Sequence, residues 1–126
     1  SARSAWVPEF LAYCATHHVP VDFASTHHYC CELDFDAQFG PGEGPPRVYR
    51  GQPYMRQSVD TVRAQIVASA FPRLPLHYSE WNVSPVHEDR FGKDSEFNAT
   101  FALQTLRDMD DVLASYSWWT ISDIFE

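Results

Sequence analysis

Three short clusters of polar and aromatic residues contain the side chains that could do chemistry. They are STHHY at residues 25–29, SEWN at 79–82 and WWTISD at 118–123. Glu80 directly follows an apolar run, and a carboxylate in such a place either meets water or has a function, because buried charges are costly unless they are paired. An ionised carboxylate can serve as a nucleophile, and a carboxylic acid can donate a proton. Glu80 is therefore the first candidate for a catalytic group.

Histidines and cysteines near the first cluster raise an alternative, a metal site made of His27, His28, Cys30 and Cys31. Neighbouring residues of a strand point to opposite faces, so four ligands within five consecutive positions do not converge on one ion. Structural zinc sites use two well-separated ligand pairs instead. We therefore expect no metal and no other cofactor. We expect the three cysteines, of which Cys14 is the third, to be free and partly buried thiols.

The composition limits the remaining function classes. The chain has 126 residues, 44% of them hydrophobic, with 17 acidic against 9 basic residues and a net charge of −8. Nucleic-acid binding needs clustered basic charge, which this sequence lacks. No apolar run approaches the roughly 20 residues of a membrane span. We therefore expect a packed domain, or part of one, that binds neither nucleic acid nor membrane.

The hydrophobic pattern predicts the elements that position the three clusters. Helices are expected at 4–18, 54–70 and about 95–113, and strands at 19–29, 74–82 and 114–126. The segment between the first strand and the second helix, residues 39–54, is rich in glycine and proline and is expected to lack regular structure. In the first helix, Trp6, Phe10 and Cys14 recur every four residues, and Val7 and Leu11 lie alongside them. In the second strand, alternation predicts one shared face for Leu76, Tyr78, Glu80 and Asn82.

Alternating helices and strands indicate parallel strands joined by right-handed crossovers. Three such units rarely form a complete fold, and a (β/α)8 barrel needs about 250 residues. The predicted fold class is therefore α/β, a partial (β/α)8 barrel of about three βα units. In such barrels the catalytic side chains lie at the carboxyl ends of the strands. All three clusters stand there, which favours a rim that binds a polar molecule with apolar faces, such as a sugar.

The motifs DFASTHHY, SEWN and WWTISDIFE together resemble glycoside hydrolase family 39, which contains β-xylosidases and α-L-iduronidases. The resemblance covers nearly the whole chain, from the helix before strand six to the end of strand eight, and is stronger toward the β-xylosidases. It implies the carboxyl-terminal part of a (β/α)8 catalytic domain, with strands six to eight. It also implies a retaining enzyme that forms a covalent glycosyl intermediate.

The resemblance assigns roles to particular residues. Glu80 matches the nucleophile at the end of strand seven. The implied substrate-binding residues are His27, Tyr29, Asn82, Trp119 and Glu126. Spacing alone places His27 and Tyr29 on one strand face, where the tyrosine hydroxyl could bond the carboxylate of Glu80.

The general acid/base of this family lies in an Asn-Glu-Pro motif at the end of strand four, and no Asn-Glu pair occurs in this sequence. The resemblance therefore implies a carbohydrate substrate, xyloside-like or uronide-like, for the parent enzyme and no turnover by this chain alone. We expect Val21, Phe23, Leu76 and Tyr78 to line the inner face of the sheet, which missing strands would cover. This face and the unpaired strand edges predict either self-association or a missing amino-terminal half. The alternative is a non-catalytic carbohydrate-binding or interaction module.

Overall fold

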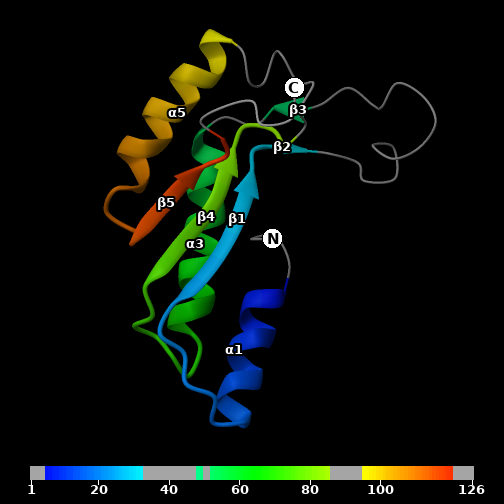
Figure 1. Ribbon diagram of the computed structural model, residues 1–126, viewed down its shortest axis with the longest axis vertical. Helices are drawn as coiled ribbons and strands as arrows, with labels where there is room; N and C mark the ends of the chain where they lie inside the picture. Colours follow the sequence, from blue (N-terminus) through cyan, green and yellow to red (C-terminus); the bar gives the residue numbers. More distant parts are fainter. Residues whose placement is uncertain (1–4, 33–47, 50–51, 86–94, 121–126) are drawn as a thin grey trace, which may run out of the picture.

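The computed structural model describes residues 5–32, 48–49, 52–85 and 95–120. Figure 1 shows a sheet with helices packed against one face. The helices are α1 (Trp6–Thr16), α3 (Gln52–Val67) and α5 (Glu96–Met109). The main strands are β1 (Ala24–Tyr29), β4 (Leu76–Asn82) and β5 (Ser115–Trp118), and a separate short pair is formed by β2 (Cys31–Glu32) and β3 (Val48–Tyr49).

The three main strands form one parallel sheet in the order β1-β4-β5. This confirms the predicted alternation of helices and strands and the parallel pairing. Because the strands are parallel, their carboxyl ends meet at one edge, which lies at the top of Figure 1. Tyr29, Asn82 and Trp118, one residue from each polar cluster, end these strands and therefore lie at a common edge of the sheet.

Helix α3 packs against the sheet between α1 and α5. Its apolar positions Val59, Val62 and Ile66 are fully buried, as their spacing predicts. From the same helix the Arg63 guanidinium donates to the backbone carbonyl oxygens of Leu74 (2.8 Å) and Val112 (2.9 Å). These two carbonyls precede β4 and β5, so Arg63 fixes the segments from which both strands start.

The apolar set predicted for the first helix is only partly buried, and the prediction for the loop was wrong. In α1 the buried residues are Val7, Leu11 and Cys14, whereas Trp6 and Phe10 are 74% and 52% exposed. Both sets have helical spacing, and the buried set is the one that joins the core beside α3. Residues 39–54 are not devoid of regular structure, because β3 pairs antiparallel with β2 and α3 begins at Gln52.

The predicted face of β4 was also wrong. Tyr78 pairs with Thr26 of β1, but the next pair is Glu80 with His27, so β4 carries one extra residue at this point. Such a β-bulge reverses the inward and outward alternation beyond it. Leu76 and Tyr78 are buried toward the helices, and Glu80 does not share their face.

The face of the sheet opposite the helices, here called the open face, is consequently less apolar than we predicted. At its amino-terminal end it carries Phe23, His77 and Ser115, with an edge-on ring contact between Phe23 and His77 and a 2.7 Å hydrogen bond between His77 Nδ1 and Ser115 Oγ. Leu76 and Tyr78, which we expected here, belong to the other face.

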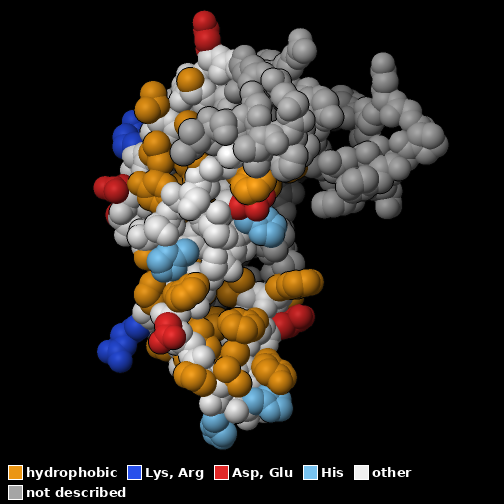
Figure 2. All heavy atoms as spheres, in the orientation of Figure 1, with side chains coloured by type: hydrophobic (Ala, Val, Ile, Leu, Met, Phe, Trp, Pro, Cys, Tyr) orange, Lys and Arg blue, Asp and Glu red, His pale blue; other side chains and the backbone are white. Residues whose placement is uncertain are grey.

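The outer edge of β1 has no strand beside it among the described residues. A groove of ≈ 620 Å³ lies between this edge and α1, and its apolar lining includes Trp6, Phe10, Val21 and Phe23. Figure 2 shows hydrophobic side chains gathered over α1 and the amino-terminal end of the sheet.

Cys14 and Cys30 are free and buried, as expected, and the Cys31 side chain lies outside the described residues. No described helix has the length and hydropathy to cross a membrane.

Candidate active site

The candidate site is built around Glu80 and Tyr29, at the carboxyl ends of two adjacent parallel strands. The Tyr29 hydroxyl donates a hydrogen bond to Glu80 Oε1, and both side chains are half-buried. The two residues are 51 positions apart in the sequence. The prediction that they lie at the same end of adjacent strands and within hydrogen-bonding reach is therefore confirmed.

The bulge in β4 explains why Glu80 faces Tyr29. Without the extra residue, Glu80 would follow Leu76 and Tyr78 toward the helices, into the apolar core. Ser79 occupies the irregular position, and its hydroxyl donates to the backbone carbonyl oxygen of Thr26 at 3.2 Å. This bond fixes the bulge to β1, and the bulge directs Glu80 to the open face.

Tyr29 is held as a neutral hydrogen-bond donor. Burial raises the pKa of its hydroxyl, and the hydrogen bond to Glu80 and the negative charge of that carboxylate raise it further. The phenol therefore keeps its proton through and beyond the physiological range. In this arrangement Tyr29 can orient a carboxylate, and it does not act as a base.

The two histidines of the first cluster point in opposite directions, as strand alternation predicts. His27 is exposed and pairs in register with Glu80, so it lies on the open face. His28 is 2% exposed and lies on the helix side, with its ring 5.4 Å from that of Tyr54. Within the described residues no three His, Cys, Asp or Glu side chains are arranged to hold a metal ion.

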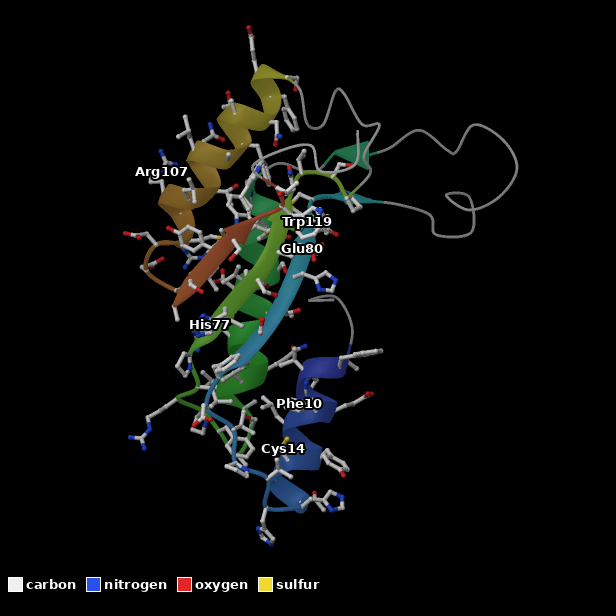
Figure 3. All side chains as sticks on the ribbon, in the orientation of Figure 1. Phe10, Cys14, His77, Glu80, Arg107 and Trp119 are labelled. Carbon is white, nitrogen blue, oxygen red and sulfur yellow. The ribbon has the colours of Figure 1, made fainter. Side chains whose placement is uncertain are left out.

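The aromatic residues at the end of β5 also separate by face. Trp118 packs edge-on against Trp81 in the core, with ring centroids 4.6 Å apart. Trp119, one residue later, is half-buried, and its N–H donates to the carbonyl oxygen of Trp81, the residue after Glu80. Figure 3 shows both Trp119 and Glu80 at the carboxyl end of the sheet. Phe10 and Cys14 lie away from this end, on α1. Trp119 is therefore placed where an indole could form one wall of a site around Glu80.

Asn82 lies nearby but is enclosed. It is 2% exposed, its Nδ2 donates to the carbonyl oxygen of Trp119 at 2.5 Å, and its Oδ1 accepts from the backbone N–H of Val83 at 2.6 Å. Both ends of the amide are thus bonded within the chain. Glu126, the last predicted site residue, lies outside the described residues.

Sequence reasoning missed Ser79 as a residue that shapes the site. A signal was present, because the buried apolar residues of β4 fall at positions 76, 78 and 81, and this spacing breaks the two-residue alternation. The break indicates an inserted residue between Tyr78 and Trp81. It thereby predicts that Glu80 changes face.

Comparison with known proteins identifies the family. The family model for glycosyl hydrolases family 39 matches residues 1–126. The chain is 36% identical to a β-xylosidase of Caldicellulosiruptor saccharolyticus and 37% identical to one of Geobacillus stearothermophilus, and the matches take in 100% and 96% of the chain. In each case the chain spans 24% of the length of the relative.

Solved structures give the same result. A crystal structure of a monomeric β-xylosidase from Caulobacter crescentus CB15 matches with a TM-score of 0.80 and 36% identity, over 97% of this chain and 24% of that one. The structure of a family 39 enzyme from Xanthomonas axonopodis pv. citri matches with a TM-score of 0.76 and 36% identity, over 92% of this chain and 22% of that one. Sequence and fold agree, and the chain belongs to glycosyl hydrolases family 39.

Proposed function

We propose that the chain is the carboxyl-terminal part of the (β/α)8 catalytic domain of a retaining glycoside hydrolase that cleaves β-xylosides. In this proposal β1, β4 and β5 are strands six, seven and eight of the barrel. The parallel order of the strands supports it. The similarity to two proteins named β-xylosidases also supports it, and the chain spans 24% of the length of each. The remaining five strands would come from the rest of the protein.

The observation that carries the proposal is the contact between Glu80 and Tyr29 at the carboxyl edge of the sheet. Glu80 is proposed as the nucleophile, whose carboxylate oxygen attacks the anomeric carbon while the bond to the leaving oxygen breaks. Water then releases the sugar from the resulting ester. Tyr29 donates its hydrogen bond to the carboxylate and holds it toward the open face.

A second carboxyl is required about 5 Å from the nucleophile to protonate the leaving oxygen, and later to take a proton from water. We propose that the rest of the protein supplies it from strand four. Asn-Glu does not occur in the present sequence.

His27 and Trp119 are proposed to contact the sugar. His27 is exposed beside Glu80 in the strand register, and Trp119 presents a half-buried indole on the other side. An indole packs well against the C–H face of a pyranose ring. Asn82 is not included in this group, because both ends of its amide are bonded within the chain.

The proposal is tested by replacing Glu80 in the intact protein. Glu80→Gln keeps the shape of the side chain but removes the nucleophilic carboxylate, so we expect loss of turnover of an aryl β-xyloside with an unchanged circular dichroism spectrum. Glu9→Gln, which alters an exposed carboxylate of α1, serves as the matched control and should retain full activity. Added azide should restore aryl-group release by Glu80→Ala, because a small anion can occupy the vacated position. Near-normal turnover by Glu80→Gln would mean that the nucleophile lies elsewhere.

A further inference from the structure

Asn82 joins the carboxyl ends of all three strands that form the candidate site. Its backbone carbonyl oxygen accepts from the N–H of Cys30, directly after β1, at 3.2 Å. Its side-chain Nδ2 donates to the carbonyl oxygen of Trp119, directly after β5, at 2.5 Å. Asn82 itself is the last residue of β4. One residue therefore makes contacts at the end of each neighbouring strand.

Trp119 is held through both of its peptide groups. Its N–H donates to the carbonyl oxygen of Trp81 at 3.0 Å, and among the described residues this is the last backbone hydrogen bond between the β4 and β5 segments. Its carbonyl oxygen accepts from the Asn82 side chain, at a point where β5 has already ended. The amide of Asn82 thus replaces the strand bond that would have fixed Trp119 in a longer ladder.

The orientation of the Asn82 amide is also fixed. Its Oδ1 accepts from the Val83 N–H at 2.6 Å, which assigns the oxygen to one side and leaves the NH2 group facing Trp119. Asn82 is buried, with 2% of its surface exposed. A bound sugar would therefore meet Trp119 and not Asn82.

We propose that Asn82 is a positioning residue for substrate binding, which acts by holding the indole of Trp119 beside Glu80. This inference rests on the proposed function, since it needs a sugar between Trp119 and Glu80. Asn82 forms no bond to the proposed nucleophile among the hydrogen bonds of the described residues. Its replacement should therefore weaken sugar binding more than it slows bond cleavage.

Asn82→Asp is the most specific test, because aspartate keeps the size and the acceptor for Val83 but loses the donor to Trp119. Loss of one buried hydrogen bond typically changes an equilibrium about tenfold. In the intact protein we expect the inhibition constant of xylose and the KM of an aryl β-xyloside to rise about tenfold, while kcat changes less than about threefold. Asn98→Asp, at the other asparagine of the chain and buried on α5, is the matched control and should leave both binding constants unchanged.

A double-mutant cycle with Trp119→Ala separates positioning from general damage. If Asn82 acts through the indole, Asn82→Asp should change the inhibition constant of xylose less than about twofold once the indole is absent. If the effects of the two substitutions on the inhibition constant are additive, or if Asn82→Asp lowers only kcat, the inference is overturned. Asn82→Ser provides a milder replacement if Asn82→Asp does not fold, and it should show the same pattern. If the wild-type protein does not turn over a β-xyloside, the proposed function is overturned, and this inference with it. If the wild-type protein is active but the variants bind the sugar as well as it does, only the inference is overturned.

Discussion

Replacing Tyr29 with phenylalanine removes one hydroxyl from the candidate site and leaves the ring in place. That hydroxyl donates to Glu80 Oε1, and its raised pKa keeps it protonated under all ordinary assay conditions. In Tyr29→Phe the carboxylate loses the donor that fixes its direction on the open face. We therefore expect slower attack on the anomeric carbon.

The size of the effect follows from the kind of bond that is lost. A hydrogen bond to a charged group contributes about 1.5–3 kcal/mol. Because about 1.4 kcal/mol corresponds to a factor of ten, kcat/KM should fall about 10- to 100-fold. The fall should be smaller than that of Glu80→Gln, since the nucleophile itself remains.

Tyr78→Phe is the matched control, because it removes a tyrosine hydroxyl from the other face of the same sheet. The Tyr78 hydroxyl is within 3.0 Å of Ser58 Oγ, on the side of the helices. Its loss should lower the midpoint of thermal unfolding, by an amount equivalent to about 1 kcal/mol, with little change in turnover. Initial rates on an aryl β-xyloside and a thermal melt of each variant measure both effects. Equal losses of kcat/KM in the two variants, or a Tyr29→Phe rate within about twofold of wild type, would refute the reasoning.

Two further predictions concern pH and assembly. Burial raises the pKa of Tyr78 above its usual value, so folding is destabilised once the unfolded chain releases this proton, that is, above about pH 10. Between about pH 10 and 12 the free energy of unfolding of the intact protein should fall faster with pH than that of Tyr78→Phe. The difference between the two slopes should be about 1.4 kcal/mol per pH unit, and equal slopes would contradict this prediction. The 126-residue chain alone should self-associate through the outer edge of β1 and its apolar groove, and should not turn over an aryl xyloside. Light scattering checks the self-association and an assay with an aryl xyloside checks the absence of turnover. A compact, active monomer would contradict both predictions.

Much of the scaffold could be predicted because its signals are local. The spacing of Val59, Val62 and Ile66 predicts α3, and the alternation of elements predicts the parallel sheet. The buried stripe of α1 could not be chosen in the same way. Two adjacent stripes, one with Phe10 and one with Leu11, both have helical spacing, and only the position of α1 against α3 decides between them. Local periodicity therefore predicted the elements but not every buried face.

The site shows the same division between local and long-range signals. The motifs at the strand ends predicted the meeting of Tyr29 and Glu80, because parallel strands bring their carboxyl ends together. The face on which Glu80 lies depends on a bulge in β4, and the role proposed for Asn82 depends on where β5 ends. Both features depend on how neighbouring strands pair, and the sequence of one strand indicates that pairing only indirectly.

The central claim is that Glu80 attacks the sugar, and one measurement tests it most directly. A xyloside fluorinated beside the anomeric carbon slows the second step of a retaining reaction and allows the glycosyl ester to accumulate. After its reaction with the intact protein, mass spectrometry of the digested chain identifies the residue that carries the sugar. We predict a fluoroxylosyl group on Glu80, in the peptide that contains residues 79–82. The same group on any other carboxylate, or steady hydrolysis without any covalent label, would contradict the account.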